Sequence, residues 1–150
     1  MPTVAVIGAS TNAERYSHQA VLRFAARGYT VWAVHPSGLA VAGHPCFRDL
    51  AALPGRPDIV TMYVNPAAGA GMAAAIRAAT PRLIILNPGA DGEPVVSALS
   101  GLPVIEACSL VLLARKYPGP GAPSHSDGAA AEQRWAEIMG EAHPPTVAEA

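Results

Sequence analysis

The sequence contains little cysteine, little lysine and little charge, and each scarcity argues against a class of protein. Its two cysteines, Cys46 and Cys108, lie far apart and form no C-x-x-C pair, so a disulfide framework or a thiolate metal site has little support. Lys116 is the single lysine beside nine arginines, 14% of the residues are charged, and the formal net charge is -1. The scattered basic residues predict no face for nucleic acid or anionic lipid.

Long hydrophobic runs are also missing, although 51% of the residues are hydrophobic. The apolar residues, largely alanine and valine, come in short runs that never approach the ~20 residues of a membrane span. Because a strand pattern begins at Thr3, we expect neither a secretory signal nor a membrane partner. The 150 residues are enough for one domain with a single core, and we expect a cytoplasmic protein with reduced cysteines.

Short apolar runs recur along the chain and alternate with helical patterns. The runs rich in β-branched residues cover residues 4–7, 30–34, 59–64, 83–86 and 103–105, and the helical patterns cover residues 18–27, 69–79, 92–99 and 108–113. The runs are continuous, as expected for strands that are buried on both faces of a parallel sheet. The sequence therefore predicts a single α/β domain, Rossmann-like, with a doubly wound five-stranded parallel sheet.

The composition changes after Tyr117. Proline and glycine alternate through residues 118–123, which predicts a spacer that cannot continue a helix. We therefore expect a ligand-binding domain over residues 1–117, and a segment 118–150 made of this spacer, a short helix within 132–141 and a frayed tail. Trp135, Ile138 and Met139 share one face of that helix, which would dock on this domain or on a second copy in a homodimer.

The predicted binding residues follow the carboxyl ends of the strands, where open parallel sheets hold their ligands. They are Gly8, Ala9, Ser10, Thr11, Asn12 and Arg15 after the first strand, His35 and Pro36 after the second, Asn65 and Pro66 after the third, and Asn87, Pro88 and Gly89 after the fourth. Their chemistry is mostly hydrogen-bond donation, so we expect a small-molecule nucleotide ligand.

The turn after the first strand resembles a phosphate-binding loop. Backbone N–H groups at the start of the following helix suit a pyrophosphate, and Arg15 could provide a strong charged partner. Gly8 is the only glycine where a dinucleotide fingerprint has three, because Ser10 and Ala13 stand at the other two positions. The alternative is that Ser10 and Asn12 only cap the helix.

The turn after the second strand argues against ordinary NAD binding. NAD sites usually place a carboxylate there for the ribose, and this chain has His35 followed by Pro36. His35 is either a partner for a nucleobase or a packing residue, and Pro36 holds it extended. An NAD(P)-binding, oxidoreductase-like domain remains an alternative because the strand, turn and helix unit is the same.

Catalytic groups are hard to find in the sequence. No Ser/His/Asp set, carboxylate pair or histidine pair at metal-ligand spacing is visible, so we expect no metal and treat enzymatic activity as uncertain. Cys108 is the best of the weak candidates for a nucleophile, because it falls at a predicted helix start where a thiolate is favoured. A buried apolar role is the alternative for that residue.

Several short motifs spread over residues 3–117 occur together in one known family. They are Val6-Ile7-Gly8-Ala9-Ser10 with Arg15 and Ser17, Gly28-Tyr29, Val34-His35-Pro36, Gly43-His44-Pro45-Cys46-Phe47, Asp58-Ile59-Val60, Asn87-Pro88-Gly89-Ala90 and the segment from Glu106 to Leu112. In this set the chain resembles the small stand-alone bacterial CoA-binding proteins, whose fold matches the CoA-binding domain of the succinyl-CoA synthetase alpha subunit. His35 departs from the asparagine common in that family, and residues 61–65 lack its Phe-Arg run.

The resemblance implies that the chain binds coenzyme A or an acyl-CoA. It implies that the first loop holds the pyrophosphate, with Ser17 among the binding residues. It also implies that the second-strand turn lies near the adenosine, and that the third- and fourth-strand turns line the pantetheine path. It does not imply ligase activity, because the histidine and nucleotide machinery of the synthetase belong to other domains. We therefore expect a non-catalytic carrier, sensor or regulatory module, with a protein-interaction module that has lost its ligand as a further alternative.

Overall fold

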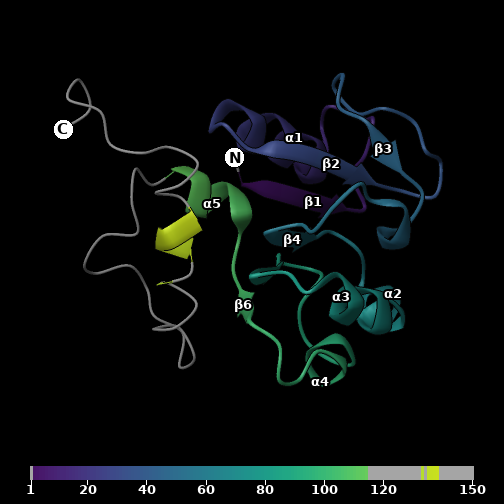
Figure 1. Ribbon diagram of the computed structural model, residues 1–150, viewed down its shortest axis with the longest axis vertical. Helices are drawn as coiled ribbons and strands as arrows, with labels where there is room; N and C mark the ends of the chain where they lie inside the picture. Colours follow the sequence, from purple (N-terminus) through teal and green to yellow (C-terminus); the bar gives the residue numbers. More distant parts are fainter. Residues whose placement is uncertain (1, 115–132, 134, 139–150) are drawn as a thin grey trace.

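A computed structural model describes residues 2–114, 133 and 135–138 of the chain (Figure 1). Its centre is a six-stranded sheet in the order β3-β2-β1-β4-β5-β6, with every neighbouring pair parallel. The strands are β1 (Thr3–Ile7), β2 (Thr30–Val34), β3 (Cys46–Phe47), β4 (Ile59–Met62), β5 (Leu83–Leu86) and β6 (Val104–Glu106). Across the described residues, no helix has the length and apolar character needed to cross a membrane.

The expected count of five strands is wrong, because β3 is a sixth. Cys46 pairs with Ala33 and Phe47 with Val34, so β3 adds a two-residue strand at the edge of the sheet. Both of its residues are only partly buried. A strand this short, half-exposed and preceded by Pro45, produces no continuous apolar run, which is why the sequence pattern missed it. The Rossmann-like α/β class itself is confirmed.

The helices follow the strands as expected, with shifted boundaries. They are α1 (Tyr16–Ala26), the 3₁₀ turn η1 (Leu50–Ala52), α2 (Pro66–Gly71), α3 (Ala73–Ala79), α4 (Val95–Ala98) and α5 (Ser109–Ala114). The single helix expected over 69–79 is two helices that meet at Met72. The first begins earlier because the Asn65 side chain accepts a hydrogen bond from the Ala68 amide and Pro66 occupies the first turn.

Alternate residues of each strand face two separate cores. In β1, Val4 and Val6 pack with α1 and α5, whereas Ala5 and Ile7 pack on the other face with α2, α3 and α4 (Figure 1). Both faces are therefore covered, so the strands are continuous apolar runs, with few polar positions, instead of alternating apolar and polar residues. This sandwich leaves the two ends of the strands as the places where polar loops gather.

The short helical segment at residues 135–138 lies on the α1 and α5 side of the sheet. Trp135 and Ile138 have no exposed surface and belong to the same hydrophobic cluster as β1 and α5. The sequence left open whether this helix face docks on its own domain or on a second copy. The structure shows it docked on its own domain. Met139, the spacer at 118–123 and the tail at 144–150 lie outside the described residues, so the division at residue 117 stays a prediction.

Candidate functional site

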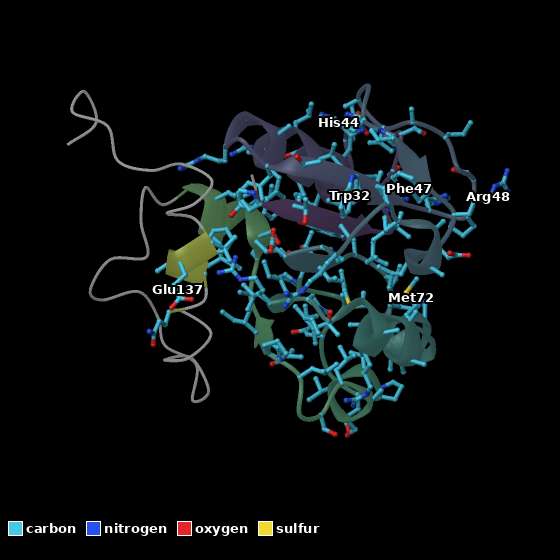
Figure 2. The ribbon with its side chains drawn as sticks, in the orientation of Figure 1. Trp32, His44, Phe47, Arg48, Met72 and Glu137 are labelled. Carbon is cyan, nitrogen blue, oxygen red and sulfur yellow. The ribbon has the colours of Figure 1, made fainter. Side chains whose placement is uncertain are left out.

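The chain reverses its direction of travel across the sheet between β1 and β4, and the site is built there. After β1 the chain moves outward to β2 and β3, and it returns to the other side of β1 as β4. In open parallel sheets, ligands bind at the carboxyl ends of the strands beside such a switch point. Phe47 and Arg48, at the end of β3, mark this carboxyl edge in Figure 2.

Gly8 brings the loop after β1 against the loop after β4. Its amide donates to the Val34 carbonyl at 2.9 Å, and its φ of 83° lies in the left-handed region. A Cβ at Gly8 would lie 3.0 Å from Val64 Cγ1 and 3.1 Å from the Tyr63 carbonyl. The loop after β1 therefore requires glycine at this position, both for its backbone conformation and for its close approach to β4.

The loop from Gly8 to Arg15 is held from behind by the first turn of α1. The Ser10 amide donates to Ser17 Oγ at 3.1 Å, and the Ser10 carbonyl accepts from His18 Nδ1 at 2.8 Å. Because a carbonyl only accepts, His18 carries its proton on Nδ1. Ser17 and His18 are both buried, so the two contacts fix the loop from the core side.

Ser10 and Asn12 do not cap α1. The N-cap is Arg15 and makes no side-chain capping bond. Instead, Ser10 Oγ accepts from the Asn12 amide at 3.0 Å and Asn12 Oδ1 accepts from the Glu14 amide at 3.0 Å. These bonds shape the loop itself, so the capping alternative from the sequence does not apply.

The outer side of the loop offers hydrogen-bond donors to solvent. Thr11, Asn12 and Arg15 are exposed, and the amides of Thr11 and Ala13 donate to no acceptor among the described residues. Arg15 makes no ion pair in this part of the chain. A loop with a fixed inner side, open amides and a positive side chain has the donor set of a phosphate site.

The turn after β2 presents a histidine in a defined tautomer. His35 Nδ1 accepts from the Ser37 amide at 3.0 Å, so Nδ1 is unprotonated and Nε2 carries the hydrogen. The ring is partly buried, and Pro36 beside it is exposed. The His35 amide donates a hydrogen bond to the Phe47 carbonyl at 2.9 Å, so β3 holds this turn at the carboxyl edge.

The remaining predicted residues lie in the turns after β4 and β5, and they differ in how far they are exposed. Asn65 uses its side-chain oxygen to cap α2, and Pro66 begins that helix. Pro88 and Gly89 are exposed. Asn87, in contrast, is 1% exposed, so its side chain points into the protein instead of toward solvent.

Asn87 is the centre of a buried polar network that the sequence analysis did not find. Its Nδ2 donates to Thr61 Oγ1 at 2.8 Å and to the Met62 carbonyl at 2.9 Å, and its Oδ1 accepts from the Ser109 amide at 2.8 Å. The Thr61 and Ser109 hydroxyls lie 2.7 Å apart. The network ties β4, β5 and α5 together beneath the site. Its one sequence signal is the threonine within an otherwise apolar strand.

Tyr63, directly after β4, is a second residue that the sequence analysis missed. Its hydroxyl is buried without a hydrogen-bond partner among the described residues. Burial raises the pKa of Tyr63 to about 12, and the nearby Ser109 and Thr61 hydroxyls offset part of this shift. The phenol therefore stays protonated in the interior near the Thr61 and Ser109 hydroxyls, while the Tyr63 backbone is the part that lies against Gly8.

Groups for catalysis do not converge at this edge in the described part of the chain. No three His, Cys, Asp or Glu side chains there are placed to hold a metal ion. Both cysteines are free, and burial raises the pKa of the Cys46 thiol above its usual range. Cys108 precedes α5 and is partly buried. The edge is therefore suited to holding a ligand with hydrogen bonds and with exposed arginines, Arg15 after β1 and Arg48 after β3.

Residues 2–114 match the family described as CoA binding domain, so the chain belongs to this family. The donor set fits such a ligand. Gly8 leaves space that a side chain would fill, and the amides of Thr11 and Ala13 suit phosphate oxygens. The resemblance noted from the scattered motifs is thereby confirmed.

Solved structures share the fold. The crystal structure of an uncharacterized protein is 27% identical, with a TM-score of 0.69, over 76% of this chain and 95% of that one. A protein from Thermus thermophilus is 28% identical, with a TM-score of 0.67, over 75% and 87%. The dinucleotide-forming acetyl-coenzyme A synthetase 1 of Ca. Korarchaeum cryptofilum is 16% identical, with a TM-score of 0.60, over 70% of this chain and 26% of that enzyme. No curated protein matches the chain.

Proposed function

We propose that this protein binds coenzyme A or an acyl-CoA at the carboxyl edge of the sheet and acts as a non-catalytic carrier, sensor or regulatory module. The observation that carries the proposal is the loop from Gly8 to Arg15. It is fixed from the core side by Ser17 and His18, and it turns open amides and Arg15 to solvent. Membership of the CoA binding domain family supports the same ligand.

Each part of the ligand has proposed partners around the edge. Ala9, Ser10, Thr11, Asn12 and Arg15 bind the pyrophosphate, with Gly8 allowing its close approach. Nε2–H of His35, beside Pro36, donates to the adenosine. The loops after β4 and β5 line the pantetheine path with Asn65, Pro66, Pro88 and Gly89, and the backbone of Asn87 contributes while its side chain holds the loop in place.

The non-catalytic role rests on the chemistry of the same edge. Histidine side chains there make structural contacts, with His18 on the Ser10 carbonyl and His35 on the Ser37 amide. Cys108 is the remaining nucleophile near the proposed pantetheine path. Measurable turnover of acyl-CoA by the native protein would contradict the non-catalytic role. If turnover is found, its loss in Cys108→Ala would identify Cys108 as the nucleophile, and unaltered turnover would exclude it. We place the protein in the cytoplasm, where CoA and free thiols coexist.

Isothermal calorimetry with CoA, acetyl-CoA, NAD and NADP tests the ligand directly. We expect heat with CoA and acetyl-CoA and none with NAD, because no carboxylate follows β2 to bind the ribose. Binding of NAD or NADP in place of CoA would favour the oxidoreductase-like alternative. No heat with any of the four, and no ligand carried through purification by mass spectrometry, would favour an interaction module.

Arg15→Ala tests the charged contact of this site. We expect CoA binding to weaken by about 1.5–3 kcal/mol, the range for a hydrogen bond to a charged group, and to become less sensitive to salt. Arg23→Ala is the matched control, because Arg23 is an exposed arginine on α1 away from the loop. Equal affinities for the two variants would remove Arg15 from the site.

A further inference from the structure

A cavity lies at the amino ends of the strands, at the edge opposite the proposed CoA site. It has a volume of about 380 Å³ and is lined by Arg56, Arg77, Thr80, Pro81, Arg82, Leu102, Pro103 and Glu137. Arg56 precedes β4, Arg82 precedes β5 and Pro103 precedes β6. Figure 2 shows Glu137 on the side of the molecule away from Phe47 and Arg48, at the other edge of the sheet.

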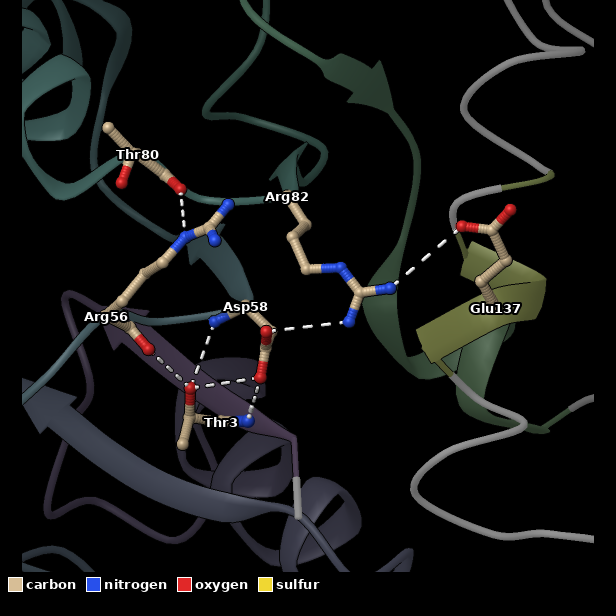
Figure 3. A network of polar contacts seen from close by, with 6 residues as sticks. All are labelled: Thr3, Arg56, Asp58, Thr80, Arg82 and Glu137. Atoms are coloured by element: carbon tan, nitrogen blue, oxygen red, sulfur yellow. Dashed lines mark hydrogen bonds and ion pairs between the residues drawn. The ribbon is translucent and has the colours of Figure 1, made fainter.

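Three of the nine arginines of this weakly charged chain gather around this cavity. Arg82 pairs with Asp58 at 3.6 Å and lies 4.0 Å from Glu137 (Figure 3). Asp58 Oδ2 also accepts a hydrogen bond from the Thr3 amide at 2.8 Å. Arg82 is therefore part of an ion-pair network that joins β1, β4 and the helical segment at 135–138.

Arg56 and Arg77 are held in place by carbonyls and not by carboxylates. Arg56 Nε donates to the Thr80 carbonyl at 2.6 Å (Figure 3), and Arg77 Nη2 donates to the carbonyls of Ala98 and Ser100 at 3.0 and 2.9 Å. No carboxylate lies within 4.0 Å of either guanidinium among the described residues. Both charges are thus oriented without being neutralised, and within the part of the chain that the structure describes most of their N–H groups have no acceptor.

The rest of the lining is apolar and gives the cavity a shape for an organic ligand. Pro81, Leu102 and Pro103 form this wall. The lining carries three arginines and one glutamate, so the cavity has an excess of positive charge. Planar guanidinium groups bind phosphate oxygens in pairs, and a cavity of this size is within the usual range for small-molecule sites.

We propose that this cavity binds a small organic phosphate, with its phosphate group between Arg56 and Arg77 and its apolar body against Leu102 and Pro103. Fixing the two guanidinium groups before binding reduces the entropy lost when the ligand arrives. Glu137 borders the same space and repels an anion. The site is independent of the CoA site because it uses none of its residues and lies at the other end of the strands.

Calorimetry with phenyl phosphate in low-salt buffer without other phosphate tests the proposal. We expect binding that Arg56→Gln and Arg77→Gln each weaken by about tenfold, the size of one charged hydrogen bond. Arg23→Gln is the matched control and leaves the affinity unchanged. We expect benzoate to bind more weakly than phenyl phosphate, because the site selects a dianion. We also expect inorganic phosphate to bind more weakly than phenyl phosphate, because it makes no contact with the apolar wall.

Two further measurements keep the result interpretable if an arginine variant fails to fold. Glu137→Gln, at a side chain that is 54% exposed, removes the repelling carboxylate and tightens phenyl phosphate binding. Saturating CoA leaves the phenyl phosphate affinity unchanged, because the ligands occupy opposite edges. Absence of binding by the native protein, or competition by CoA together with no response to Glu137→Gln, would overturn the proposal.

Discussion

Gly8 shows how a single residue sets the geometry of the proposed CoA site. Its positive φ and its close approach to Tyr63 and Val64 are separate constraints, and a side chain would violate both. Gly43 has almost the same φ, 81°, but a Cβ there would meet nothing within 4 Å. The two glycines therefore separate the effect of backbone strain from the effect of lost space.

Gly8→Ala should lower stability and abolish CoA binding, whereas Gly43→Ala should lower stability alone. Both variants place alanine in the left-handed region at a cost of about 1–2 kcal/mol, and Gly8→Ala also pushes the loops after β1 and β4 apart. Urea unfolding and calorimetry with CoA measure the two effects. Retention of native CoA affinity in Gly8→Ala would contradict the proposed site.

Tyr63 gives the protein a predicted sensitivity to alkaline pH. Its pKa is about 12 in the folded chain and about 10 when unfolded, so the unfolded state releases its proton first as the pH rises. The contribution of Tyr63 is complete below about pH 10 and decreases between about pH 10 and 12, by roughly 2–3 kcal/mol in total.

Tyr63→Phe should flatten this alkaline decrease in the free energy of unfolding. Tyr16→Phe is the matched control, because Tyr16 is 71% exposed. Urea titrations at a series of pH values measure the slope. Equal slopes for Tyr63→Phe and the native chain would show that the phenol does not titrate as an interior group.

The sequence predicted some residue positions better than others for a physical reason. Residues directly after a strand, such as Gly8 and His35, were predictable because the end of an apolar run fixes their place at the sheet edge. The inward direction of Asn87 was not predictable, because the turn after β5 can present a side chain to solvent or to the core. Tyr63 was missed because it fell inside a run that was assigned to the strand.

At the scale of elements, the apolar runs predicted the four longest strands because burial on both faces demands continuous hydrophobic sequence. The edge strand β3 depends on its pairing with β2, which a local pattern does not record. The earlier start of α2 is a local feature, since Asn65 caps the Ala68 amide, but Asn65 and Pro66 were assigned to the turn after the preceding strand. The network of Thr61, Asn87 and Ser109 depends, like β3, on partners that a local pattern does not record. It joins three elements whose polar residues look isolated along the chain.

Asn87→Ala should lower the free energy of unfolding by about 3 kcal/mol, because it leaves the buried Ser109 amide without an acceptor and removes the side-chain donor to Thr61 Oγ1 and the Met62 carbonyl. Asn65→Ala, which removes the exposed cap of α2, should lower it by about 1 kcal/mol. Urea denaturation compares the two. A smaller loss in Asn87→Ala than in Asn65→Ala would mean that the buried network contributes little.

At the scale of the whole molecule, the chain extends its core beyond the last strand and helix of the domain. The sequence predicted that Trp135 and Ile138 share a helix face, and it could not identify the surface beneath that face. The structure places both in the cluster with α1 and α5. The stability of the α/β domain thus includes residues that follow the predicted spacer.

Trp135→Ala should lower the free energy of unfolding by about 3–5 kcal/mol, as expected for truncation of a large buried side chain. Val111→Ala, at a residue on α5 that is 54% exposed, should change it by less than about 0.5 kcal/mol. Chemical denaturation provides the comparison. A loss below about 1 kcal/mol in Trp135→Ala would show that the segment does not dock in solution.

The two outer strands of the sheet have a consequence for how copies of the protein meet. β3 has two residues and β6 has three, so each border offers few open main-chain groups to a strand from another chain. Short borders of this kind disfavour aggregation by strand addition. A homodimer of this protein would therefore form through helix surfaces, and the continuous sheet would end at each subunit.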